Sequence, residues 1–146
     1  LRSSDLLQSS KKLGSAGEVL HVITPHDGEY KRLLGESPGD DRVAAARQGA
    51  AQLGAVVLLK GPTTIVAHPD CRVLLSTVAD QRLATAGTGD VLAGVIAAGI
   101  AGGLDPFHAA GVGAELHGMA GSRGRRVGLT AGDLPPLIAE TLSLLT

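Results

Sequence analysis

The sequence predicts an α/β fold, with a largely parallel sheet flanked by helices, in a single domain that spans residues 1–146. In the first half of the chain, short β-branched runs alternate with helical patterns, which is the order that builds such sheets. The run VVLLK at residues 56–60 is apolar without alternation, as expected for a strand that helices cover on both faces. Helical patterns dominate the second half of the chain.

Four strands are expected from short apolar runs that end at turn residues. The run LHVIT stops at Pro25, and VVLLK stops at Gly61. The runs TTIVA and RVLLS flank a turn at residues 68–71, which favours a hairpin. The expected strands are residues 20–24, 56–60, 63–67 and 72–76.

Five helices are expected from apolar patterns and from their start and stop residues. Asp105 and Asp133 precede prolines and are helix-start signals, whereas Gly35 and Gly54 are typical of helix ends. The helix over 90–102 is hydrophobic nearly all round, which predicts a buried position. The expected helices are residues 28–34, a helix from Asp40 or Asp41 to Leu53, and residues 90–102, 106–120 and 134–144.

Composition excludes several classes of protein. With 13 Lys+Arg and 14 Asp+Glu, the formal net charge of −1 gives no electrostatic footprint for nucleic acid or an anionic membrane. Cys71 is the one cysteine, so a disulfide framework and a cysteine zinc cluster are excluded. No apolar run approaches the roughly 20 residues of a membrane span, and LRSSDLLQSSKK lacks the apolar region of a signal peptide. We therefore expect a cytoplasmic location. Because Met119 is the only methionine, we also expect the chain to be part of a longer protein.

The strongest local signal is AGTGD at residues 86–90, directly before an expected helix. Gly87 and Gly89 allow the backbone to approach a ligand, and the free N–H groups and dipole of a helix N-terminus favour a phosphate. Asp90 lies where it could take a proton from a substrate hydroxyl, and a phosphate site beside a base is what phosphoryl transfer requires. The alternative is that Asp90 is a helix N-cap and the glycines form a tight turn.

Two further polar clusters follow strands, at the edge where open α/β sheets bind ligands. In TPHDGE, His26 and Glu29 could hydrogen-bond a polar substrate, or they could simply cap a helix. In KGPTT at residues 60–64, Lys60 would be costly to bury unless it is paired. It therefore meets a phosphate or emerges into solvent.

Other polar groups favour structural interpretations. Glu115 and His117 point about 200° apart on a helix, so they cannot share a metal ion with His108, and no metal site is predicted. No function is assigned to Cys71 or to a basic cluster that is interpreted as a solvated loop, namely Arg123, Arg125 and Arg126.

Four segments carry a resemblance to a known family: VITPHDGEYKRLLG, VVLLKGPTTIVA, LATAGTGDVLAGVIAAGIAGGLDPFHAA and LHGMAG. Together, over residues 20–145, they resemble the C-terminal half of the ADP/ATP-dependent NAD(P)H-hydrate dehydratases, which belong to the ribokinase-like superfamily. The Gly-Asp motif alone is weakly specific, but joined to TPH-x-GE at this distance it is strongly specific. Asp27 stands where the family usually has proline.

The resemblance implies a ribokinase-like fold and a metabolite-repair reaction, in which NADH or NADPH hydrated at C6 of the nicotinamide ring is dehydrated. The terminal phosphate of ADP or ATP goes to the C6 hydroxyl, with Mg²⁺ held mostly by phosphates and water, and elimination of phosphate restores NAD(P)H and leaves AMP or ADP. Asp90 would be the base, and His26 with Glu29 would contact the hydrated dinucleotide. The adenine nucleotide would be held by Lys60, Gly61, Pro62, Thr63, Thr64, Gly87, Thr88 and Gly89.

The family's catalytic domain is longer than this chain, and its N-terminal half has no counterpart here. Its absence would leave a strand edge exposed, so we expect the chain to form a homo-oligomer and to need that N-terminal half. Two alternatives stay open: a ribokinase-like kinase that acts on a hydroxymethylpyrimidine or pyridoxal-like alcohol, and a non-catalytic nucleotide-binding fragment.

Overall fold

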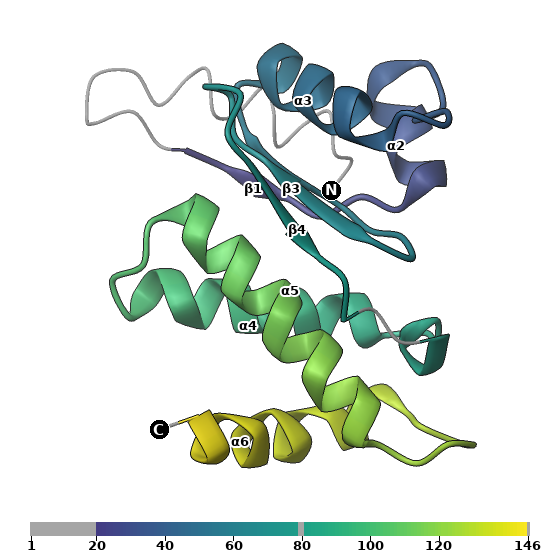
Figure 1. Cartoon of the computed structure of the whole chain (residues 1–146), viewed down its shortest axis with the longest axis vertical. Coiled ribbons are helices and arrows are strands. Elements are labelled where there is room, and N and C mark those ends of the chain that lie inside the picture. Colours follow the sequence, from purple (N-terminus) through teal and green to yellow (C-terminus); the bar gives the residue numbers. More distant parts are fainter. Residues whose placement is uncertain (1–19, 79–80, 146) are drawn as a thin grey trace.

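A computed structural model describes residues 20–78 and 81–145, whose strands form one sheet in the order β1-β2-β3-β4 (Figure 1). All four strands lie within the expected runs: β1 (Val22–Ile23), β2 (Val56–Leu59), β3 (Thr64–Ala67) and β4 (Val73–Ser76). The segment on which the signal-peptide prediction rests, residues 1–12, lies outside the described residues.

The sheet of the described residues is mixed, which corrects the expectation that it is largely parallel. β1 pairs with β2 in parallel, whereas β2–β3 and β3–β4 are antiparallel, the latter being the predicted hairpin. The physical reason is the length of the connections. A parallel pair needs a crossover of about a dozen residues or more, as between β1 and β2, and short turns join the other strands.

The five expected helices are all present, with ends that differ from the prediction by a few residues. Asp41 caps one through the Ala44 N–H, and Asp105 caps another through two backbone N–H groups. Gly35 and Gly54 end helices with φ of 87° and 59°, which favours glycine. The helices are α2 (Asp27–Leu34), α3 (Arg42–Leu53), α4 (Thr88–Ala101), α5 (Pro106–Arg123) and α6 (Leu134–Leu145), with short 3₁₀ turns η1 (Gln81–Leu83) and η2 (Ala131–Asp133).

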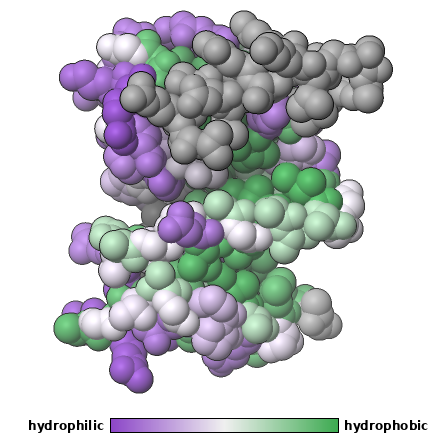
Figure 2. Space-filling view, turned by 180° about the vertical axis from the view of Figure 1, so that it is seen from behind, coloured by the Kyte–Doolittle hydropathy of each residue, from purple (hydrophilic) through white to green (hydrophobic). Residues whose placement is uncertain are grey.

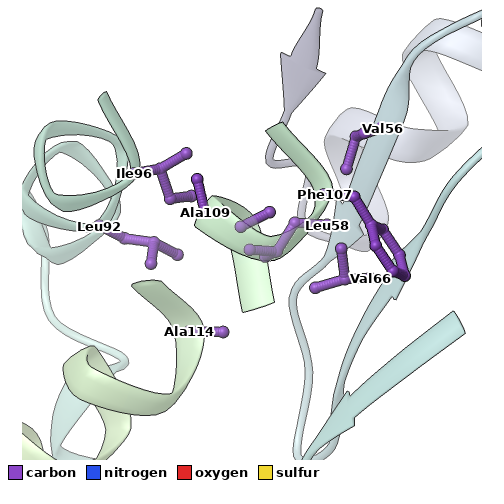
Figure 3. Close-up of a cluster of buried hydrophobic side chains, with 9 residues drawn as sticks. Val56, Leu58, Val66, Leu92, Ile96, Phe107, Ala109 and Ala114 are labelled. Atoms are coloured by element: carbon purple, nitrogen blue, oxygen red, sulfur yellow. The ribbon is translucent and has the colours of Figure 1, made fainter. Parts of the chain in front are cut away.

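The sheet separates two layers of helices, and α6 packs on α5 as an outer layer (Figure 1). β2 shows why: Val57 and Leu59 face α2 and α3, whereas Val56 and Leu58 face α4 and α5. Figure 3 shows Leu58 and its neighbours meeting apolar side chains from α4 and α5. The uninterrupted apolar sequence of β2 is thus explained, because both faces of this strand are buried.

α4 is not buried all round, which corrects the prediction for this helix. Leu92 and Ile96 pack into the core, but the helix contacts mainly α5, and its opposite side is exposed. In the view from behind, apolar side chains gather over the half of the molecule formed by α4, α5 and α6 (Figure 2). The exposed small residues of α4 are Ala93, Gly94, Ala97, Ala98 and Ala101. No helix in the described ranges is long and apolar enough to cross a membrane.

Candidate functional site

A cavity of about 790 Å³ opens among the segments that follow β1 and β2, the N-terminal turn of α4 and the inner side of α5. The predicted residues that line it are His26, Lys60, Gly61, Pro62, Thr64, Gly87, Thr88, Gly89 and Asp90. Glu29 and Thr63 are not among the lining residues. Sequence reasoning missed other lining residues, among them Ser76, Thr85, Leu92, Ala114, His117 and Gly118.

His26 and Glu29 form a reciprocal cap at the start of α2. The His26 Nδ1 accepts from the Gly28 and Glu29 N–H groups at 3.0 and 3.3 Å, and a Glu29 carboxylate oxygen accepts from the His26 N–H at 2.8 Å. The capping alternative is therefore present in the structure. The cap also fixes the imidazole at the cavity wall, because it binds Nδ1, while Nε2 lies 3.6 Å from the other carboxylate oxygen of Glu29.

Lys60 follows β2 and finds a partner at the cavity wall. Its Nζ lies 3.4 Å from a carboxylate oxygen of Glu29, and its side chain is 29% exposed. Burial raises the pKa of Glu29, but the His26 N–H and the charges of Lys60 and His26 outweigh burial and hold this pKa below its ordinary value. Glu29 therefore stays ionised and anchors the ammonium group beside the cavity.

The AGTGD segment forms a glycine-capped helix start. Gly87 is the N-cap, with φ of 86°, so the hypothesis that Asp90 is the N-cap is wrong. The Thr88 hydroxyl closes the turn, because its one proton is shared between the carbonyls of Leu83 and Thr85, at 2.6 and 2.8 Å. The next residue, Gly89, has no hydrogen-bond partner for its N–H among the described residues. A free donor thus lies in the wall of the cavity, at the positive end of the α4 dipole.

Asp90 occupies the third position of α4 and is exposed at the cavity. Its N–H donates to the Gly87 carbonyl at 3.1 Å, but its side chain makes no hydrogen bond or ion pair with any described residue. Its carboxylate therefore has no structural partner in the described part of the chain, which distinguishes it from Glu29, whose oxygens are both occupied.

The LHGMAG segment of α5 is the back wall of the site. The His117 Nε2 lies 2.9 Å from the Thr88 carbonyl, and since a carbonyl only accepts, Nε2 carries the proton. Burial lowers the pKa of His117, so the ring is neutral near neutral pH. Gly118 and Gly121 allow close approach, because a Cβ at Gly118 would lie 2.5 Å from the Val78 carbonyl oxygen. The spacing of these two glycines, three residues apart on one helix face, was the signal in the sequence.

The remaining polar groups lie on α5 and on the loops around it or in the hairpin turn. Glu115 is exposed and accepts from Ser76 at 2.8 Å, while His117 points inward, so the two do not converge on one ion. Among the described residues, no group of three or more His, Cys, Asp or Glu could hold a metal ion. Arg123 belongs to α5 and pairs with Glu140, which corrects its assignment to a loop, and the other two arginines and Cys71 are exposed.

Chemically, the arrangement can bind an anion at the Gly89 N–H with Lys60 alongside, while Asp90 stays available to accept a proton. An anion site and a base at the start of a glycine-capped helix, at the edge of an α/β sheet, are typical of enzymes that move phosphoryl groups. The fold places the chain in the ribokinase-like class. It superposes on 96% of its length with a ribokinase-like superfamily protein of Enterococcus faecalis, at a TM-score of 0.70 and 27% identity.

The chain belongs to the NAD(P)H-hydrate dehydratase family, whose sequence pattern matches residues 5–144. It is 44% identical, over 123 residues, to the ADP-dependent (S)-NAD(P)H-hydrate dehydratase of Neisseria meningitidis serogroup B, covering 79% of this chain and 42% of that protein. It also resembles the bifunctional NAD(P)H-hydrate repair enzyme Nnr of Moorella thermoacetica, with 48% identity over 122 residues, 77% of this chain and 23% of that enzyme.

A solved structure extends the similarity to three dimensions. The ADP/ATP-dependent NAD(P)H-hydrate dehydratase of Bacillus subtilis, co-crystallised with ATP and Mg²⁺, is 30% identical and matches with a TM-score of 0.82. The match covers 90% of this chain and 50% of that one. The chain thus spans half or less of the length of these family members.

Proposed function

We propose that this chain carries the nucleotide-binding and proton-accepting part of an ADP- or ATP-dependent dehydratase that returns hydrated NADH and NADPH to NAD(P)H. One observation carries the proposal: the free Gly89 N–H and the unpartnered Asp90 carboxylate are adjacent in the first turn of α4 and line the same cavity. The names of the Neisseria and Bacillus relatives support the substrate and the nucleotide.

In the proposed reaction, the terminal phosphate of the nucleotide binds at the Gly89 N–H, and Lys60 offsets its charge. Asp90 takes the proton of the C6 hydroxyl as that oxygen bonds to phosphorus and the bond to the leaving nucleotide breaks. Phosphate then leaves C6 together with a ring proton, which restores the double bond. His26 would contact the hydrated dinucleotide from the wall opposite α4, and Glu29 would act through His26 and Lys60.

Magnesium fits this site as a companion of the nucleotide. The described residues offer no cluster of three ligands. Among the described residues that line the cavity, Asp90 is the one that carries a carboxylate. Phosphate oxygens and water would supply most of the coordination, as Mg²⁺ commonly accepts. When bound, the ion would neutralise charge on the transferring phosphate.

The active form would contain more than this chain. The match with half of each solved domain and the exposed face of α4 support the proposal that residues 1–146 are the C-terminal part of one domain. Within the described sheet β1 has β2 as its single neighbour, so its other edge could take a strand from the rest of the domain. A homo-oligomer and a cytoplasmic location stay predictions.

The test is an assay of this chain joined to the rest of its domain. Hydrated NADH with Mg²⁺ and ADP or ATP should release phosphate and regenerate the NADH absorbance, and comparing the two nucleotides identifies the preferred donor. Phosphorylation of a pyridoxal-like or hydroxymethylpyrimidine alcohol instead would support the kinase alternative. Nucleotide binding without turnover on any of these substrates would support a non-catalytic fragment, and both outcomes contradict the proposal.

A further inference from the structure

We propose that Arg42 is a positioning residue for the nucleotide site, acting with Asp27 to fix the turn that follows β2. The identity of the ligand rests on the proposed function. The positioning role itself rests on contacts that do not depend on that function.

Arg42 joins two segments that follow neighbouring strands. Its Nη1 donates to both carboxylate oxygens of Asp27, at 2.9 and 3.0 Å, after β1. Its Nη2 donates to the Lys60 carbonyl at 2.8 Å, after β2. Since Asp27 directly follows His26, one guanidinium holds the proposed dinucleotide side and the proposed nucleotide side of the cavity at a set separation.

The guanidinium also packs against the backbone of Gly61. A Cβ at Gly61 would lie 2.6 Å from Nη2 and 3.1 Å from Cζ of Arg42. Any larger residue at position 61 would displace an arginine that three hydrogen bonds hold in place. Gly61 in the KGPTT segment therefore serves this contact, because it lets the side chain reach the Lys60 carbonyl.

Burial separates this contact from an ordinary surface ion pair. The Arg42 side chain is 22% exposed, and its Nε–H is buried without a hydrogen-bond partner in the described part of the chain. An unpaired buried donor is unfavourable, and a guanidinium free to swing outward would hydrate it. Arg42 stays inside because its two terminal nitrogens are bound at both segments, which is what a positioning role requires.

The consequence reaches the anion site through Lys60. Arg42 donates to the Lys60 carbonyl, and Glu29 lies beside the Lys60 ammonium group. Lys60 is therefore restrained at its backbone and at the end of its side chain. The ammonium lies 3.4 Å from where a Cβ of Gly89 would stand. Loosening the turn should therefore weaken nucleotide binding while the Asp90 carboxylate stays in place.

The experiment compares Arg42→Gln, Arg42→Lys and a matched control, Arg47→Gln, in the complete chain. Arg47 lies on the same helix and is exposed, and its side chain makes no hydrogen bond or ion pair with a described residue. Calorimetric titration with Mg·ADP measures affinity, and hydrogen exchange measures the protection of amides in residues 60–64. Both Arg42 variants should lose at least about tenfold in affinity and exchange faster in this segment, because lysine keeps the charge but cannot bridge two acceptors.

Full Mg·ADP affinity in Arg42→Lys would overturn the proposal, because a positive charge alone would then be enough. Unchanged hydrogen exchange at residues 60–64 in Arg42→Gln would also overturn it. If Arg42→Gln does not fold, Asp27→Asn replaces it in the experiment. The Asp27 side chain is 60% exposed, so this substitution leaves no buried polar group without a partner at position 27. This variant should show a smaller loss in the same direction, and parental behaviour would equally overturn the proposal. If the parent chain does not bind Mg·ADP, the proposed function fails, and hydrogen exchange alone decides the role of Arg42.

Discussion

Replacing Asp90 with asparagine separates a catalytic carboxylate from a structural one. The variant keeps the size and shape of the side chain but removes its ability to accept a proton. If Asp90 takes the hydroxyl proton, turnover of hydrated NADH should fall about 10²–10⁴-fold, the usual effect of losing a general base. Nucleotide affinity should hold or improve, because a negative charge beside the phosphates disappears.

The structure limits what the same change can cost in stability. The Asp90 side chain makes no hydrogen bond with a described residue, and the N-cap of α4 is Gly87, so no cap is lost. What remains is the attraction between the carboxylate and the helix dipole, worth about 0.3–1 kcal/mol at an exposed site. We therefore expect the free energy of unfolding to change by less than about 1 kcal/mol.

The reciprocal control is Asp105→Ala in α5. The Asp105 carboxylate accepts from the N–H groups of Phe107 and His108, and its bonds to the His108 side chain and to these N–H groups hold its pKa below its ordinary value. Loss of this N-cap should lower the stability of the folded domain and leave turnover unchanged. Chemical denaturation and the hydrated-NADH assay, both on the complete domain, give the two readouts. Asp90→Asn with turnover within about threefold of the parent and intact nucleotide binding would refute the mechanism.

Three further predictions use the same cavity and its surroundings. Gly89→Val should weaken Mg·ADP binding at least about tenfold by calorimetry, because the new side chain enters the space beside Lys60. The control variant Gly94→Val has open space around it and should bind normally. Equal affinities of the two variants would contradict an anion site at Gly89. Because the pKa of His117 is lowered in the folded chain, that chain binds fewer protons than the unfolded chain just below a pH of about 6.5. The free energy of unfolding should therefore fall as the pH drops through this window. His117→Gln should weaken this pH dependence, as measured by denaturation curves at several pH values. Ala97→Glu on the exposed side of α4 should leave the chain's own stability unchanged but block association with a separately expressed N-terminal half, as measured by sedimentation; normal association would contradict the proposed interface.

Local chemistry made most of the secondary structure predictable. Turn residues bound each strand, and Asp105 and Gly54 mark a helix start and a helix end in sequence as they do in the structure. The start of α4 was the exception. Its N-cap is a glycine with positive φ, which leaves no side-chain signature, and the acidic residue three positions later was the more visible candidate.

Pairing and burial were harder to predict, because both depend on segments distant in the chain. The apolar run of β2 indicated two covered faces, but the direction of β3 follows from a short turn. The nearly uniform hydrophobicity of α4 predicted that other parts of the protein cover every side of this helix. It could not indicate that one side, with Ala97, meets no described element.

The candidate site shows the same division. His26, Lys60 and Gly89 follow strands or open a helix, where position alone predicts ligand contact. His117 was first considered as a metal ligand and rejected, and its bond to Thr88 became visible only when α5 was seen to pack against the start of α4. The pattern of glycines in LHGMAG predicts close packing, but not which segment packs there.

The contacts that shape the anion site come from within this chain. The Thr88 hydroxyl binds two carbonyls of the preceding turn, and His117 binds the Thr88 carbonyl from α5. That carbonyl and the Gly89 N–H belong to one planar peptide unit, so the bond from His117 also fixes the direction of the free donor. Contacts within the described residues therefore hold the proposed anion site, whereas the exposed side of α4 and the outer edge of β1 in the described sheet are where we propose that the rest of the domain binds. We therefore expect nucleotide binding and turnover to be separable, with Mg·ADP binding retained by this chain and turnover of hydrated NADH requiring the completed domain.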